Sequence, residues 1–492
     1  MIKAFFLDFY GTVVHEDGEI IKKITQIIYD TGEVENMSEI DAFWWNDFQN
    51  MFTNSYGDCF ETQRELEKKS LKHTLIKFGS IADVDRLSNY MFEHWVKPPI
   101  FEDSLKFFES SPIYIVSNID TADILKAIEF HGLTPTDVFT SEDIHHIYKG
   151  EFLALRALLH FNVLRLFAPS PMMDNQNGLN ALAIPYVEQY TNIAQPQLTV
   201  KEVLAKIVKD LLAAKDLMRE REIFNESDAS SPMYKRSQRM NYYAVTGLLA
   251  RVCLYASSND EEGGSARKKA FNYSTEIIKA VDSGIFPFVD KKLVTGSPDD
   301  PDRIFSSEVI FALSHASRNQ LFKNYFDPTR VPNYVFRMDN DLMNNLIFGG
   351  TATGGNQDDY RYRVNWVASG SNRYFYKYAD MEDTGKIENT MIPMLRIGEM
   401  YLIAAESQST SLTAGSSYVN TLRRNRGVTT VSSLTQDLLV YEYIRELYGE
   451  GQLFYLYKRL YRPVLFSSVS SKNPEASDQI FVVPLPDSET EN

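Results

Sequence analysis

The pattern of apolar residues along this chain of 492 residues changes at Gly150. Before that residue, short apolar runs typical of strands alternate with helical segments. After it, helical periodicity dominates, and long loops rich in aromatic residues separate the helices. A chain of this length is long enough for several domains, each with its own core. We therefore predict two domains, 1–149 and 150–492, that differ in fold class.

The first predicted domain begins and ends with short apolar runs. Residues 2–7 and 113–116 each form such a run next to turn-forming or polar residues, which is typical of a buried parallel strand. Between them, approximately residues 16–98 show helical patterns. A strand, a long helical insertion and a further strand predict an α/β core of Rossmann-like type with a helical cap. This core is incomplete, because the pattern after Lys149 is helical and supplies no further strand.

Polar residues follow the predicted strands, at the positions where open α/β sheets bind ligands. Asp8 and Thr12 follow the first strand, Ser117 ends the second, and Lys149 comes later in the chain. In this order they resemble the first three motifs of the haloacid dehalogenase superfamily. The resemblance implies that Asp8 is a nucleophile and a Mg²⁺ ligand, and that Thr12, Ser117 and Lys149 hold the transferring group.

The first domain also departs from that superfamily. Tyr10 stands where its phosphatases carry a second aspartate, and the first arginine, Arg64, comes too late to be the early cap arginine of its dehalogenases. The fourth, acidic motif is missing, since Asp174 follows no strand. Asp8 before Gly-Thr is also explained by turn chemistry alone. An Asp-nucleophile hydrolase of phosphate esters or halo-acids therefore remains an alternative function, and we expect it to be impaired.

The second predicted domain is mainly helical. The helix over 151–167 is expected to bury Phe152, Leu155, Leu159 and Val163 on one face. Thr199 is expected to cap the next helix. Further helices are predicted over 199–219, 241–256, 268–281, 393–407, 416–427 and 441–460. Neighbouring helices would pair as tetratricopeptide-type hairpins. Loops at about 285–390 predict an irregular subdomain.

Six segments of this domain resemble the SusD/RagB family, in the family's order. They are LRALLHFNVLRLF, LLARVCLYA, PMLRIGEMYLIAAES, NTLRRNRG, RELYGEGQLFYLYKR and VVPLPDSE. The resemblance implies an outer-membrane lipoprotein that binds oligosaccharides for nutrient uptake beside a SusC-like TonB-dependent transporter, without catalysis or a cofactor. Relatives carry an additional N-terminal portion, whose place is taken here by residues 1–149.

One segment, 358–378, combines aromatic and polar side chains at high density. Sugar rings pack their C–H faces on aromatic rings and need polar partners for their hydroxyls. We expect Trp366 to be the main stacking residue. The other expected ligand-binding residues are Tyr360, Arg361, Tyr362, Asn365 and Tyr374. An alternative is that this alternating pattern forms strands whose aromatic residues cover a core.

The charged residues near the C-terminus have structural explanations. Glu399 and Glu406 are expected to anchor helix packing, and Arg445, Glu446 and Glu450 to form an ion network. A second group is expected at a helix C-terminus, where the helix dipole favours cations. This group is Arg423, Arg424 and Arg426.

Charge and cysteine content limit the partners and the compartment. A net charge of −16 argues against a nucleic-acid partner, and Cys59 and Cys253 give no disulfide framework. The chain as written shows no signal peptide, lipid-anchoring cysteine or spanning helix, which predicts the cytoplasm and conflicts with the location that the family implies. The first domain lacks the fourth motif that its superfamily carries after residue 150, and the second domain lacks the N-terminal portion that its family carries before it. A recombined or artificial join in which neither part works is therefore a further hypothesis.

Overall fold

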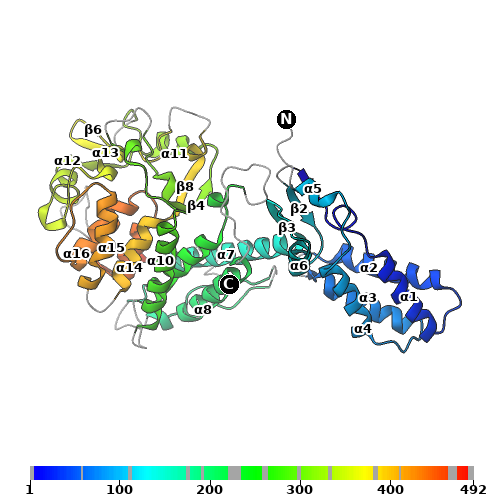
Figure 1. The fold of residues 1–492 in the computed structure, drawn as a ribbon. Coiled ribbons are helices and arrows are strands. Elements are labelled where there is room, and N and C mark those ends of the chain that lie inside the picture. The colour runs from blue at the N-terminus through cyan, green and yellow to red at the C-terminus, as the bar shows by residue number, and fades with distance from the viewer. Residues whose placement is uncertain are drawn as a thin grey trace. The chain divides into compact units, whose positions relative to one another are not determined.

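The computed structural model divides into two compact units, Met1–Lys149 and Gly150–Asn492 (Figure 1). Each unit has its own apolar core. The structure describes residues 5–56, 59–108, 113–172, 178–189, 193–219, 234–257, 264–295, 301–330, 335–380, 386–408, 412–463 and 474–485.

The first unit contains a three-stranded parallel sheet with the order β1-β2-β3. Its strands are β1 (Phe5–Leu7), β2 (Ile113–Ser117) and β3 (Asp137–Thr140). The register pairs Leu7 with Ile115 and Ser117 with Thr140, so the carboxyl ends of the strands lie at one edge. The two strands predicted from the sequence are confirmed. The third was not predicted, because only two of its four residues, Val138 and Phe139, are apolar.

Helices fill the chain between β1 and β2, which confirms the predicted helical insertion. They are α1 (Gly18–Thr31), α2 (Met37–Asn54), α3 (Gln63–Lys77), α4 (Val84–Val96) and the short α5 (Ser104–Phe108). Thr62 and Glu65 form a capping box at the start of α3, which satisfies backbone N–H groups of its first turn. After β2, α6 (Thr121–His131) ends at Gly132, whose φ of +63° is the left-handed conformation that glycine adopts readily.

Helix α7 (Ser141–Phe167) buries a different face from the one predicted. Phe152 and Leu159 are 72% and 63% exposed, and Val163 is exposed as well. The buried residues are Ala154, Ala157, Leu158, Phe161 and Leu164. This helix carries two apolar stripes. The buried stripe contains alanines, whose small side chains let neighbouring helices approach closely. The size of an apolar side chain therefore does not predict its burial in this helix.

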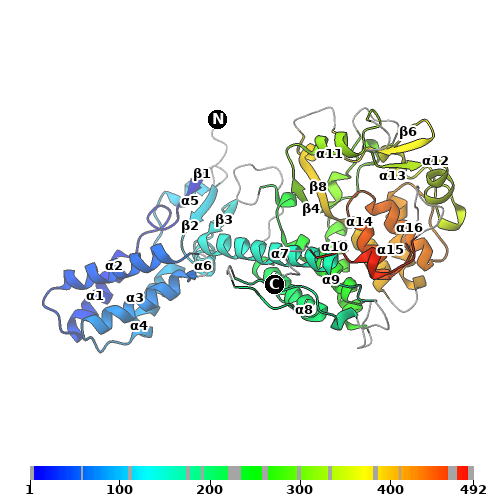
Figure 2. The same ribbon diagram turned by 180° about the vertical axis from the view of Figure 1, so that it is seen from behind.

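The second unit is mainly helical, as predicted. Its longer helices are α8 (Val200–Met218), α9 (Tyr242–Ala256), α10 (Ser265–Asp282), α14 (Ile397–Ser407), α15 (Leu412–Asn425), α16 (Gln436–Leu447) and α17 (Leu453–Leu460). Helix α9 packs against α8 and α10, α10 packs against α14, and α14 packs against α15 and α16 (Figure 2). Thr199 caps α8 through a capping box, as expected.

A loop-rich subdomain with short strands lies between α10 and α14 in the chain. Strand β4 (Val309–Ser314) pairs with β8 (Met391–Arg396), and β7 (Asn372–Phe375) pairs with both β5 (Arg337–Asp339) and β6 (Trp366–Ser369). Its helices include α11 (Arg318–Tyr325), α12 (Asn340–Leu342) and α13 (Tyr360–Asn365). The short α18 (Asp478–Phe481) lies near the C-terminus. The irregular subdomain was predicted, but residues 393–396 are strand rather than helix.

Candidate functional site

The four residues predicted as a hydrolase site lie in the first unit, around the ends of β1 and β2 and on α7. Asp8 is exposed directly after β1, and Ser117 is buried at the end of β2, so these two lie at the same edge of the sheet. Thr12 is exposed in the following turn. Lys149 is exposed eight residues into α7, about 12 Å along the helix from its start. Among the described residues, no hydrogen bond or ion pair joins any two of the four.

Tyr10 and Arg64 hold the helical insertion together. The Tyr10 hydroxyl donates to the backbone carbonyl of Trp95 in α4. The guanidinium of Arg64 donates two hydrogen bonds of 2.6 Å to Asp123 in α6. The carboxylate of Asp120 accepts from the backbone N–H groups of Gln63 and Arg64, and burial raises its pKa. These contacts attach α3 to the start of α6, so Arg64 is committed to a structural ion pair.

The residues around Asp8 do not fit a Mg²⁺ site. Mg²⁺ prefers several oxygen ligands in octahedral geometry. Within the described ranges, no three His, Cys, Asp or Glu side chains are grouped so that they could hold a metal ion. Asp174 lies outside the described residues. No metal-dependent step follows from this arrangement.

The structure buries most of the residues predicted to bind sugar. Trp366 is 5% exposed, with ring centroids 4.9 Å from Phe375 and 4.8 Å from Tyr448. Tyr362 and Tyr374 are buried as well, and so are Arg361 and Asn365. Tyr360 is half-buried, with its ring against Gly427. Trp366 from β6 and Tyr362 from α13 belong to one buried core cluster, so their role in sugar stacking stays a prediction.

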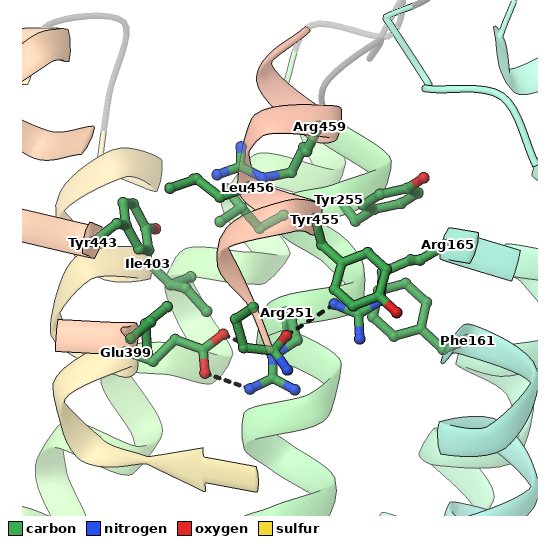
Figure 3. A pocket seen from close by; sticks show the side chains of 13 residues that line it. Phe161, Arg165, Arg251, Tyr255, Glu399, Ile403, Tyr443, Tyr455, Leu456 and Arg459 are labelled. Atoms are coloured by element: carbon green, nitrogen blue, oxygen red, sulfur yellow. Dashed lines mark hydrogen bonds and ion pairs between the residues drawn. The ribbon is translucent and has the colours of Figure 1, made fainter. Parts of the chain in front are cut away.

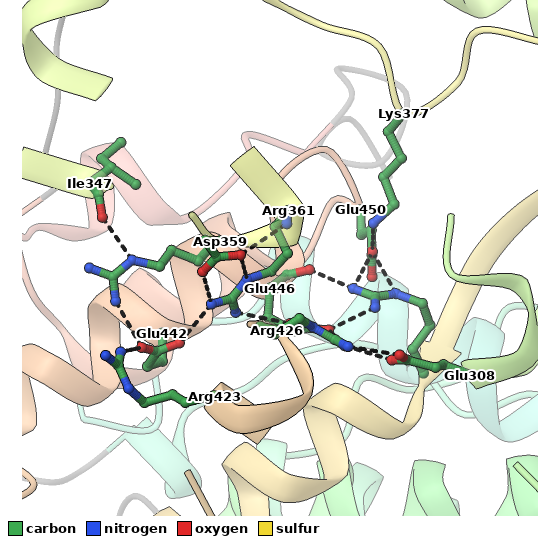
Figure 4. Close-up of polar contacts among 12 residues, drawn as sticks. Glu308, Ile347, Asp359, Arg361, Lys377, Arg423, Arg426, Glu442, Glu446 and Glu450 are labelled. Atoms are coloured by element: carbon green, nitrogen blue, oxygen red, sulfur yellow. Dashed lines mark hydrogen bonds and ion pairs between the residues drawn. The ribbon is translucent and has the colours of Figure 1, made fainter. Parts of the chain in front are cut away.

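Arg361 belongs to a buried ionic network that Figure 4 shows. Its guanidinium contacts Asp359 at 2.5 Å, Glu442 at 3.1 Å and Glu446 at 3.0 Å. Glu446 also pairs with Arg396 and Arg426, each at 2.7 Å. The other members are Glu308, Lys377, Arg423, Arg445 and Glu450. This network joins α13, β8, α15 and α16, and it confirms the predicted structural role of Arg445, Glu446 and Glu450.

Each charged side chain of this network lies beside at least one charge of opposite sign. Burial alone would raise the pKa of Glu442, but Arg445, Arg361 and Arg423 outweigh that effect and hold the pKa at about 2. Arg423 and Arg424 lie in the last turn of α15 and Arg426 follows it, as predicted. Arg424 is exposed, whereas Arg423 and Arg426 are 2% and 0% exposed and pair with Glu442, Glu308 and Glu446. Glu399 and Glu406 do anchor packing, through Arg251 and Arg459.

An exposed aromatic pair, Tyr325 and Phe336, was missed in the sequence. Tyr325 ends α11 and is 48% exposed; Phe336 precedes β5 and is 62% exposed. Their ring centroids are 6.3 Å apart with the planes at 35°, and the Phe336 backbone N–H donates to the Tyr325 carbonyl at 2.7 Å. Phe326, 5.8 Å from Phe336, connects the pair to Phe375 in the core.

Exposed polar side chains lie close to Tyr325 in the chain. The Arg330 guanidinium donates to the backbone carbonyl of Asn324 at 2.9 Å, and Arg330, Lys323 and Thr329 are exposed. Exposed aromatic faces beside such donors match the two needs of a bound sugar. The signal was present in the sequence as NYFDPTRVPNYVF, where aromatic and polar residues alternate without a strand pattern. Residues 331–334 lie outside the described ranges.

Comparison with known proteins agrees with the fold of the larger unit. A SusD-like family model, described as "Starch-binding associating with outer membrane", matches residues 121–254. A SusD superfamily protein from Bacteroides thetaiotaomicron has a TM-score of 0.54 and 18% identity over 96% of both chains. A putative sugar binding protein from Bacteroides vulgatus has a TM-score of 0.53 and 19% identity over 71% of this chain and 76% of its own. No curated protein matches the chain.

The fold is SusD-like. A second SusD superfamily protein from Bacteroides vulgatus agrees, with a TM-score of 0.51 and 22% identity over 75% of this chain and 79% of its own. The segment matched by the SusD-like family model starts at Thr121, within the first unit, and continues through α7 into α9. A join of two reading frames at Gly150 would therefore fall inside both this segment and a continuous helix. The comparisons give no support to the haloacid dehalogenase resemblance.

The membrane location was predicted in two conflicting ways. No helix within the described residues is both long and apolar enough to cross a membrane. The description of the SusD-like family model names association with the outer membrane, and nothing in the comparisons supports the cytoplasmic prediction.

Proposed function

We propose that the SusD-like unit binds oligosaccharides. The observation that carries this proposal is the match of residues 121–254 to a family model described as starch-binding. The fold shared with a putative sugar binding protein from Bacteroides vulgatus supports it. The proposed function is binding rather than catalysis, and the engagement of many buried charges of this unit, such as Glu446 and Arg426, in structural ion pairs supports it.

Tyr325 and Phe336 are the stacking residues of this proposal. Both rings are open to solvent, and their positions are fixed by a backbone hydrogen bond and by Phe326 behind them. A saccharide lying across both rings removes apolar surface from water. The exposed side chains of Arg330 and Lys323, near Tyr325 in the chain, are the proposed donors to its hydroxyls. The aromatic pair supplies affinity, and the polar residues supply selectivity.

The proposal also includes a cellular location and a partner protein. We infer an outer-membrane location and a SusC-like TonB-dependent transporter as the protein to which bound glycan is delivered. The description of the matching family model, which names association with the outer membrane, supports the location. Fractionation of cells that produce the chain, followed by copurification under mild detergent, tests both statements. Recovery only in the soluble fraction, without a transporter, contradicts them.

Glycan binding itself is tested with the purified full-length chain. Affinity electrophoresis in gels that contain soluble starch, together with calorimetric titration of a panel of defined oligosaccharides, covers the class named by the SusD-like family model. We expect retardation by at least one polysaccharide and saturable binding of its oligosaccharides. Failure to bind any glycan of a broad panel, in a chain shown to be folded, contradicts the proposed function.

A further inference from the structure

A small pocket lies within the helical part of the second unit, away from the exposed aromatic pair (Figure 3). Its wall includes Arg165 from α7, Arg251 and Tyr255 from α9, Glu399 from α14 and Tyr455 from α17. The pocket offers about 40 Å³, whereas one water needs roughly 10–15 Å³. It therefore has room for a few atoms but not for a sugar ring.

Two of the three arginines on this wall are neutralised by carboxylates. Arg251 donates to Glu399 at 2.7 and 2.5 Å, and Arg459 donates to Glu406 at 2.7 and 2.9 Å. The Nη1 atom of Arg251 is nevertheless buried without a hydrogen-bond partner in the described structure. One donor of a paired arginine is thus left unsatisfied.

Arg165 has no carboxylate partner among the described residues. It is 2% exposed, and the acceptors of its guanidinium in the described part of the chain are neutral amide oxygens, of Gln452 at 3.1 Å and of Asn162 at 2.5 Å. Phe161 and Tyr455 lie against the guanidinium at 4.3 and 3.8 Å. Its Nε atom has no hydrogen-bond partner within the described ranges.

The environment of Arg165 is therefore electrostatically unfavourable. Burial, and next the nearby charge of Arg251, lower the pKa of Arg165 to about 9, so it still carries a proton at neutral pH. A buried charge without a counter-charge destabilises a fold strongly. The hydroxyl of Tyr255, also on the pocket wall, is another buried donor without a partner in this part of the structure.

We propose that this pocket binds a small monovalent inorganic anion of the size of chloride, held by Arg165 Nε and Arg251 Nη1. Figure 3 shows both guanidinium groups extending into the same space from α7 and α9. One negative charge balances the excess of one positive charge, and its ligation satisfies donors that are otherwise buried without partners. Because the pocket lies where α7, α9, α14 and α17 meet, the anion stabilises the helix packing.

The first test is a crystal of the full-length chain grown or soaked in bromide. We expect an anomalous peak in the pocket, within hydrogen-bond distance of Arg165 Nε. A pocket that holds only water at saturating bromide overturns the proposal. This measurement needs no variant, so it stays decisive if a substitution at Arg165 prevents folding.

The second test is thermal unfolding in sodium chloride, bromide, sulfate and gluconate at equal ionic strength. A ligand that binds only the folded state raises the midpoint progressively with its concentration. We expect a rise of several degrees in chloride and bromide relative to gluconate, and a smaller rise in sulfate, which is too large for the pocket. Arg165→Gln should remove the difference between halide and gluconate, and Arg424→Gln, at an exposed arginine, should keep it. Equal midpoints of the unsubstituted chain in chloride and gluconate contradict the proposal, even with a bromide peak in the crystal.

Discussion

Two aromatic regions of the loop-rich subdomain, similar in composition, differ in what covers their rings. Trp366 lies between Phe375 and Tyr448, and the ionic network around Glu446 fixes the neighbouring helix α13. Tyr325 and Phe336 are supported from behind by Phe326 and are open on the other side. A high density of aromatic residues in the sequence therefore does not identify a binding surface. The side chains that arrive from distant parts of the chain decide which rings remain accessible.

The largest effect is expected from the network that supports the buried region. Glu446→Gln removes the shared partner of Arg361, Arg396 and Arg426. Breaking a buried ion pair costs about 3–5 kcal/mol, and we expect the upper end because three cations lose a partner. Urea unfolding measures this loss. The exposed control, Asp437→Asn, should change the free energy of unfolding by less than about 1 kcal/mol. Comparable losses in both variants contradict the role assigned to Glu446.

Trp366→Ala should lower the free energy of unfolding and leave glycan binding nearly unchanged. Removal of a buried Trp side chain costs about 3–5 kcal/mol, mainly through lost burial and the remaining cavity. We expect this loss in denaturant unfolding. The glycan affinity of the folded fraction should stay within about twofold of the unsubstituted chain. A large loss of affinity in a chain that remains folded would return Trp366 to the binding site.

The dependence of the free energy of unfolding on pH should show how strongly the network stabilises the ionised form of Glu442. The folded pKa of Glu442, about 2, lies below its usual value of 4.5. Its contribution is therefore fully present above pH 4.5 and is lost as the pH falls toward 2. The shift corresponds to about 3 kcal/mol. Denaturant unfolding from pH 2 to pH 7 measures it, and Glu442→Gln should flatten that part of the profile. An unchanged profile in the variant would show that other groups cause the acid sensitivity.

The smallest effect is expected at Asp8. Because the fourth, acidic motif is missing from the sequence and no metal-binding group of three His, Cys, Asp or Glu side chains occurs within the described residues, Asp8→Asn should leave the hydrolysis of a generic phosphate monoester with Mg²⁺ at the same background rate. A fixed-time colorimetric assay of both chains is sufficient. Turnover above background that disappears in the variant would establish the hydrolase that the sequence resemblance implied.

Local signals predicted much of the helical framework. Helix α8 follows from its cap residue Thr199 and its periodicity, and α9 and α10 follow from their apolar patterns. These features lie within a few residues of each other in the chain. The pairing of β4 with β8 joins residues about 80 positions apart, and no local pattern records it.

The candidate site was harder to predict for the same reason. Tyr448, which covers Trp366, comes from the end of α16, and Glu446 reaches Arg361 from the same helix. Only the folded chain reveals these partners. The exposure of Tyr325 and Phe336 likewise depends on how α11 meets β5. Sequence alone identified the aromatic-rich subdomain but not which of its rings face solvent.

The most direct test of the central claim is calorimetric titration of the best-bound oligosaccharide into the double variant Tyr325→Ala, Phe336→Ala. The control is Phe152→Ala, which removes an exposed phenylalanine from α7 in the same unit. We predict at least a tenfold loss of affinity in the double variant, since two stacking contacts of about 1 kcal/mol each are removed, and no change in the control. Unchanged affinity in a folded double variant would contradict the assignment of glycan binding to this pair.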